Sequence, residues 1–478
     1  MSNQQTKEEL QFFLALRPAY PLLHKPRDTT SDPRTFRSLM VFVALGAGLS
    51  IASVIATRRF LYADSSYTLL AMWERESFFI PSPGRWFASI ASQWLPVLAM
   101  QLGWRNLGGI ATLFGLNLWM NPVLAVLAVW WASGRSREIT LLVLFCEVFL
   151  FQTIYVMIEG ESSVSFWLTS ILLILTLRKD FAYPVLLLFL PILFTHDSVV
   201  AVLAPILAVL LVWRRGYVRY YGAARFWSLV AVLALVVVLI SWRAAGPDPN
   251  RAYFLSGALQ TPLNPTFVLT ALAFGSLFLQ VFRPGLAWPP RVFWASTGLL
   301  LLLPFALPEL IWPFYHYRSR ALNAVLAVIV FAYLHGRVHW RLPSPAPLAT
   351  RSVLALVFVV FAFQGRVTWE WREHMRHFRT ELADVRGVIQ FPLDGPFADP
   401  RSRQFSWSWT TPVRSVVFQA MSEGEVRAIM LNADTARWQP FRPNFAAELP
   451  DLSAFGVRYA PELVNSGGNS VPATGIPR

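Results

Sequence analysis

The sequence predicts an all-α polytopic membrane protein with about nine to eleven transmembrane helices and a small α/β domain at its C-terminal end. Charged residues make up 14% of the 478 residues, whereas a soluble domain carries about 25%. Hydrophobic residues make up 55% and gather in uncharged runs that end at Arg, Lys or Pro/Gly clusters. This composition excludes a disordered or collagen-like chain, and the single cysteine, Cys146, excludes an intrachain disulfide.

The apolar runs set the expected number of spans. They lie at 38–57, 112–133, 139–158, 163–177, 181–195, 198–213, 226–242, 266–282, 292–313, 320–335 and 351–365. Several are shorter than the roughly 20 residues that a crossing helix needs. The runs at 181–195 and 198–213 are alternatively one helix broken at His196-Asp197, so the count stays a range.

The distribution of charge predicts the topology. The segments expected inside hold 19 Lys and Arg against 6 Asp and Glu, whereas residues 366–478 hold 13 and 12. Because positive charge accumulates in cytoplasmic loops, the +14 net charge indicates topology rather than nucleic-acid binding. We expect a bacterial inner-membrane protein with a cytoplasmic N-terminal tail (1–37), a transmembrane domain (38–365) with a large extracytoplasmic first loop (58–111), and a periplasmic C-terminal domain (366–478). Arg58 and Arg59 oppose this bias and are either functional or tolerated.

Local patterns predict structure outside the spans. Amphipathic stretches at 66–80 and 86–103 predict helices in the first loop. One face of a further helix is predicted by the spacing of Trp371, Met375, Phe378, Leu382, Val385 and Ile389. The runs Val413–Phe418 and Val426–Leu431 are typical of short strands.

The first loop carries the strongest candidate for chemistry. Asp64 follows the first span, and Arg85 comes later in the same loop. A carboxylate at a membrane surface can act as general base toward a sugar hydroxyl, and an arginine can hold a phosphate through two hydrogen bonds. The structural alternative is a helix cap at Asp64.

Three further motifs fall near predicted span ends. Glu159 and Glu161 could orient an acceptor or share a cation, or form a polar turn. The His196-Asp197 pair could relay protons or bind phosphate, or break a helix. Tyr315, His316, Arg318 and Arg320 suit a lipid phosphate better than simple interfacial anchoring, because anchoring does not explain both arginines. Glu309 lies close enough in sequence to join that cluster.

The first loop also carries a resemblance to a known family. The acid after the first span, the amphipathic loop and the run Pro83-Gly84-Arg85-Trp86 resemble the GT-C superfamily of membrane glycosyltransferases. The resemblance implies a GT-C-like bundle, Asp64 as catalytic base, and a polyprenyl-phosphate sugar donor used on the non-cytoplasmic face. Many members carry an acidic pair here, whereas Asp64 is followed by Ser65. We therefore assign no metal ligand, and a divalent metal (Mg²⁺ or Mn²⁺) stays an open possibility.

These observations predict an integral membrane glycosyltransferase that moves a sugar from a polyprenyl-phosphate donor to a glycan or lipid acceptor of the cell envelope. Asp64 would act as base, and Arg85, Arg318 and Arg320 would hold the donor phosphate. The expected partners are these substrates and membrane lipid, with no nucleic acid. One alternative is a transporter or flippase for lipid-linked saccharides, which predicts charges along the depth of the bundle. Another is a non-catalytic subunit of an envelope-assembly complex, which has no need of Asp64.

Overall fold

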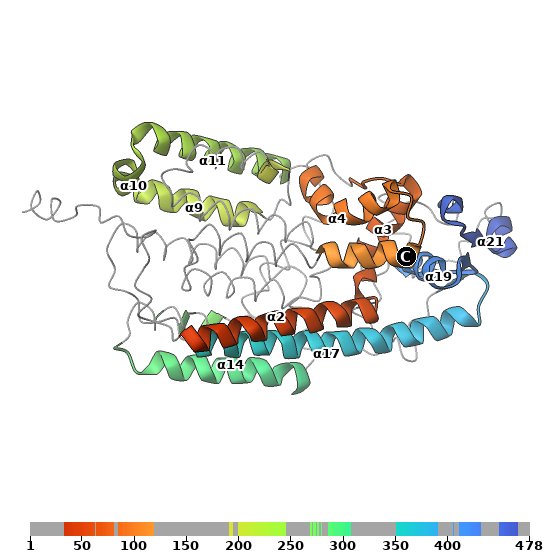
Figure 1. Ribbon diagram of the computed structural model, residues 1–478. Coiled ribbons are helices and arrows are strands. Elements are labelled where there is room, and N and C mark those ends of the chain that lie inside the picture. Colours follow the sequence, from red (N-terminus) through yellow and green to blue (C-terminus); the bar gives the residue numbers. More distant parts are fainter. Residues whose placement is uncertain are drawn as a thin grey trace, which may run out of the picture.

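The computed structural model describes residues 33–62, 64–80, 85–118, 191–194, 199–244, a few positions between 268 and 279, 285–306, 350–390, 405, 411–431 and 449–466. These residues are mostly helical (Figure 1). The helices are α2 (Pro33–Ala56), η1 (Arg59–Leu61), α3 (Asp64–Arg75), α4 (Trp86–Gln101), α9 (Val200–Val212), α10 (Arg214–Tyr221), α11 (Ala223–Ala244), α14 (Trp288–Ala306), α17 (Thr350–Ala383), α19 (Thr411–Glu423), η10 (Ser453–Phe455) and α21 (Pro461–Ser466). The strands are β1 (Gly387–Gln390), β2 (Glu425–Val426), β3 (Ala428–Leu431) and β4 (Arg458–Tyr459).

Two helices of the described part are long and apolar enough to cross a membrane. They cover Phe36–Ala56 in α2 and Ala223–Arg243 in α11, and they coincide with runs that the sequence marks as spans. A shorter apolar helix covers Leu107–Leu118. The criterion is length and composition alone, so it identifies candidates for crossing.

The long helices α2 and α17 pack side by side and run in the same direction (Figure 1). Near the middle of α2, the ring of Phe42 meets the ring of Phe361 edge-on, with centroids 5.9 Å apart. Just beyond its end, Thr57 accepts a hydrogen bond of 2.9 Å from Trp371 Nε1 through its backbone oxygen. Since the residue numbers increase together along both helices, the first loop and the residues after 366 lie at the same end of the molecule.

Helix α17 passes without interruption through residue 366, where the C-terminal domain is expected to begin. Trp371, Met375, Phe378 and Leu382 are buried, which confirms the predicted helical face over this stretch. The face does not continue, because α17 ends at Ala383 and Gly387, the first residue of β1, adopts a φ of 83°. The predicted helical positions of Val385 and Ile389 are therefore wrong, and Ile389 lies in β1.

Two short parallel strand pairs follow α17. Strand β1 pairs with β3, and β2 pairs with β4. The predicted strand at Val426–Leu431 is confirmed, since β2 and β3 occupy it. The predicted strand at Val413–Phe418 is wrong, because these residues belong to α19, which packs against α3 and β3. A short apolar run buried on all sides has no helical periodicity to read, and Pro412 near its start suits a first helical turn.

Gly46→Ala is expected to loosen the contact between α2 and α17. A Cβ at Gly46 would lie 2.1 Å from Cε2 of Phe361, and such overpacking costs about 1–3 kcal/mol. Gly48→Ala is the matched control, because nothing lies within 4 Å of a Cβ at Gly48. That control should gain helix propensity, by up to about 1 kcal/mol. Thermal unfolding in detergent measures both, and an undiminished midpoint for Gly46→Ala would contradict this packing.

Candidate functional site

Asp64 is the first residue of α3. The chain reaches it from α2 through η1, whose N-terminal cap is Arg58. Arg58 has a φ of 54°, in the left-handed region that non-glycine residues rarely adopt. Its Nη1 donates a hydrogen bond to Ser422 at the end of α19, and its guanidinium lies over the ring of Phe418. The C-terminal part of the chain thus helps to hold the turn that leads to Asp64.

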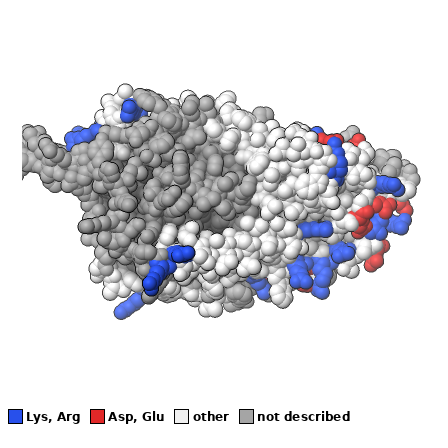
Figure 2. Space-filling model, in the orientation of Figure 1, with Lys and Arg blue, Asp and Glu red and all other residues white. Residues whose placement is uncertain are grey.

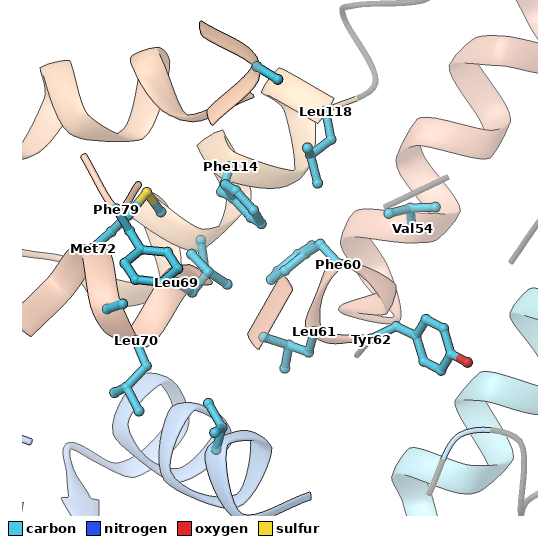
Figure 3. Close-up of a cluster of buried hydrophobic side chains, with 14 of the residues drawn as sticks. Val54, Phe60, Leu61, Tyr62, Leu69, Leu70, Met72, Phe79, Phe114 and Leu118 are labelled. Atoms are coloured by element: carbon cyan, nitrogen blue, oxygen red, sulfur yellow. The ribbon is translucent and has the colours of Figure 1, made fainter. Parts of the chain in front are cut away.

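The side chains of this turn point in different directions (Figure 3). Phe60 lies near Phe114 and Leu118, whereas Tyr62 points away from them (Figure 3). The helix at Leu107–Leu118 approaches Phe60 closely, since a Cβ on Gly115 would lie 2.9 Å from the Phe60 ring. The turn is therefore packed from both sides, and the backbone that enters α3 has little freedom to shift.

Arg59 is a buried cation that joins this turn to α17. Its side chain is 1% exposed and donates to the backbone oxygen of Gln364 (3.3 Å), to Gln364 Oε1 (2.6 Å) and to Thr368 Oγ1 (2.9 Å). These partners are all neutral, and burial lowers the pKa of Arg59 to about 9. Within the described part of the chain, Arg59 Nε has no hydrogen-bond partner. Among the described residues, no carboxylate forms a salt bridge with this guanidinium.

A second buried guanidinium joins α19 to α17. Arg414 is fully buried, donates to the backbone oxygen of Phe405 (2.7 Å) and lies 3.2 Å from His374 Nε2. Its guanidinium also lies over the ring of Trp371, 5.1 Å from the centroid. Burial lowers the pKa of Arg414 to about 10. Tyr62 meets the rings of Trp371 and Phe405 edge-on, with both centroids 5.7 Å away, so this cluster also touches the approach to Asp64.

Arg85 is the N-cap residue of α4, and the residues that follow it contact Phe194. The backbone amides of Phe87 and Ala88 both donate to the carbonyl of Phe194, at 3.2 and 3.3 Å. Trp86 packs its ring against the ring of Phe194, with centroids 5.3 Å apart. Phe194 is the last described residue before His196-Asp197. The structure thus brings the Arg85 segment of the first loop to the chain that enters the His196-Asp197 motif.

Gln93 of α4 joins two parts of the first loop by hydrogen bonds to the backbone of Phe79. Its Oε1 accepts from the backbone amide of Phe79, and its Nε2 donates to the backbone oxygen of the same residue, both at 2.8 Å. Phe79 meets Tyr67 of α3 edge-on, with centroids 5.1 Å apart. The helix that begins at Asp64 and the helix that begins after Arg85 are therefore linked through Phe79.

The remaining predicted site residues lie outside the described residues. They are Glu159, Glu161, His196, Asp197, Glu309, Tyr315, His316, Arg318 and Arg320. The described ranges contain no group of three or more His, Cys, Asp or Glu side chains that could hold a metal ion.

Sequence reasoning missed the cluster around Arg414 and His374. A lone arginine in the run Val413–Phe418 was a usable signal, because a charge inside an apolar run needs a partner. The partner could not be named, because His374 lies in a different element.

Comparison with protein-family models, with curated proteins and with solved structures finds no match to this chain.

His374→Gln is expected to make the protein less sensitive to acid. Burial and the nearby charges of Arg414 and His377 hold the pKa of His374 well below its usual value, so the folded chain keeps this imidazole neutral. The unfolded chain takes up a proton below about pH 6.5. Stability is therefore retained above that pH and falls below it, by up to about 1.4 kcal/mol per pH unit.

Unfolding midpoints measured in detergent from about pH 7.5 down to about pH 5.5 test this expectation. The matched control is His377→Gln, which changes a partly exposed imidazole on the same helix and should keep most of the acid sensitivity. Equal acid sensitivity in His374→Gln and the unmodified chain would contradict the assignment.

Proposed function

We propose that this chain is an integral membrane glycosyltransferase of the GT-C type. It would transfer a sugar from a polyprenyl-phosphate donor to a glycan or lipid acceptor of the cell envelope, on the extracytoplasmic face. The observation that carries the proposal is the parallel packing of α2 and α17. It supports a single site region in which Asp64, the Arg85 segment and the C-terminal residues lie at one end of the molecule.

The distribution of charge supports a membrane placement. Every acidic side chain that the structure describes lies in the first loop or beyond residue 366. At the opposite end, where α10 lies and where α2 begins, the charged side chains of the described residues that this view shows are basic (Figure 2). Its described charges are Arg34, Arg37, Arg214, Arg215, Arg219, Arg225 and Arg291. A purely basic end agrees with a cytoplasmic face, and a mixed end agrees with an extracytoplasmic one.

The proposed reaction needs a base that activates the acceptor and a positive charge that stabilises the leaving phosphate. The Asp64 carboxylate takes the proton of the acceptor hydroxyl, whose oxygen forms a bond to the anomeric carbon of the sugar. The bond from that carbon to the phosphate oxygen breaks, and the lipid phosphate leaves with the electron pair. Position favours an acidic residue here, because Asp64 begins α3 and negative charge interacts favourably with a helix N-terminus.

The departing phosphate needs positive charge, and Arg85 is the described candidate to supply it. A cation just before a helix is unfavourable for the helix itself, and no acidic residue lies in the first turn of α4. A phosphate at this position would interact favourably with both the guanidinium and the helix N-terminus. Arg318 and Arg320 stay candidates for the same phosphate, and a divalent metal (Mg²⁺ or Mn²⁺) would supply the same kind of charge.

Asp64→Asn is expected to abolish transfer while the protein stays folded and inserted. The amide keeps the shape of the side chain but cannot accept the proton. The assay incubates purified protein with labelled polyprenyl-phosphate sugars and an envelope lipid extract, and it measures released lipid phosphate. Asp384→Asn, an exposed carboxylate beyond the end of α17, is the matched control and should retain activity. Full activity in Asp64→Asn would refute the assignment, and translocation without released lipid phosphate would favour a flippase.

Arg85→Gln is expected to raise the KM for the lipid-linked donor by roughly tenfold to a hundredfold, because a charge-assisted hydrogen bond is worth about 1.5–3 kcal/mol. The KM for the acceptor should change little. Arg376→Gln is the matched control, since Arg376 is an exposed arginine of α17 that pairs with Glu373. An unchanged donor KM in Arg85→Gln would remove Arg85 from the phosphate site.

A further inference from the structure

Helix α4 exposes a row of large apolar side chains on its outer side. A row of residues with helical spacing is partly or fully exposed, and we call it the α4 stripe: Trp86, Ile90, Trp94, Leu98 and Leu102. Leu102, at the C-cap, is 78% exposed. The opposite side of α4 is buried, and it holds Ser89, Ser92 and Gln93 among apolar residues. A helix at a water-exposed surface carries charged and polar residues on its outer side, whereas the outer side of α4 carries the stripe.

The inward polar groups of α4 are satisfied within the protein. Gln93 forms two hydrogen bonds with the backbone of Phe79. Ser92 Oγ donates to the backbone oxygen of Ser89 at 3.0 Å, and Asn117 Nδ2 donates to that of Ala91 at 2.9 Å. The bonds of Gln93 with Phe79 and of Asn117 with Ala91 join α4 to other segments and fix its rotation about its axis, so the outward position of the stripe is a property of the packed loop.

The surroundings of α4 place its two ends in different settings. At the N-terminal end, Phe194 accepts from the α4 backbone, and Arg243 in the last turn of α11 donates to the neighbouring Leu193 oxygen at 2.7 Å. This end therefore lies level with the end of a candidate membrane span. Past the C-terminal end, Arg105 pairs with Glu76 at 2.6 Å, and both side chains are exposed. Helix α4 thus lies between a span end and an exposed ion pair.

Exposed tryptophans occur on other long helices near the same level. Trp242, beside Arg243, is 78% exposed, and Trp369 of α17 is 64% exposed. Trp369 follows Thr368, the partner of Arg59 just beyond the end of α2. Tryptophan is enriched where a membrane meets water, because its ring is apolar and its N–H is polar. The α4 stripe continues this set of exposed rings with Trp86 and Trp94.

We infer that α4 lies in the outer interface of the bilayer, with the α4 stripe directed into the boundary between headgroups and acyl chains. Helix α4 carries no charged residue, and Arg85 and Arg105 flank it. A helix at the interface binds through the apolar area that it buries there, which the stripe supplies. The inference rests on the membrane placement of the proposed function. It adds that the first loop itself is held at headgroup depth, where it meets the phosphate of a lipid-linked substrate rather than a free sugar.

Spin labels on the full-length chain test this inference directly. Cys146→Ser removes the one native cysteine, and single cysteines are then placed at Leu98 and, separately, at Leu102. Val238→Cys on α11 reports a lipid-facing position, since Val238 is 61% exposed on a candidate span. Thr380→Cys on α17 is the water-facing control. The proteins are reconstituted in nanodiscs of phosphatidylethanolamine and phosphatidylglycerol, and collision with oxygen and with a water-soluble nickel chelate is measured.

At Leu98 and Leu102 the ratio of oxygen to nickel accessibility should exceed the Thr380 value several-fold and approach the Val238 value. Accessibility like that of Thr380, while Val238 reports lipid, would overturn the inference and leave the proposed function standing. Nickel access at Val238 as well would refute the membrane placement, and the inference with it. A third outcome is that the label at Leu98 is shielded from both reagents and regains access when the protein is diluted among more nanodiscs. That result would show that the stripe packs against a second copy of the chain, and it would also overturn the inference.

Discussion

The parallel packing of α2 on α17 is the constraint on which the rest of the described structure depends. Arg59 and Gln364 bond across a separation of 305 residues, and close approach at Gly46 leaves no room for a side chain. Two helices that start at the same end of the molecule must also deliver their following segments to the same end. The first loop and the C-terminal residues therefore meet, and α19 packs against α3 as a consequence.

Two buried guanidiniums stabilise this meeting in a specific geometry. Arg59 joins the turn after α2 to α17, and Arg414 joins α19 to α17. Burying each cation is costly, as the lowered pKa values of both side chains indicate. The cost is offset only when the acceptors stay in place, so a shifted turn would leave a charge in an apolar interior. This sensitivity gives the backbone leading to Asp64 a defined position.

Some of this arrangement could be predicted from the sequence, and the limits have physical causes. The face formed by Trp371 and Phe378 was visible because helical periodicity is a local property. The helix at Val413–Phe418 was mistaken for a strand because its surroundings, not its pattern, bury it on every side. Arg59 stood out as a charge at a span end, but its partners on α17 depend on the tertiary fold. For the candidate site, Asp64 and Arg85 follow from loop position, whereas the approach of Phe194 to α4 does not.

The end of the molecule that holds the first loop has two kinds of surface, one apolar and one charged. The C-terminal residues contact the first loop at this end and fix its position. The α4 stripe is apolar, whereas the nearby pair of Arg105 and Glu76 and the ring of Phe455 beneath Arg105 belong to the charged surface. A loop held only by lipid contacts would slide along the interface, because apolar contacts are not directional. Hydrogen bonds from Arg58 and Arg59 to α19 and α17 supply the missing direction. Under the proposed function, lipid would define the substrate side, whereas the position of α3 is defined by the C-terminal helices.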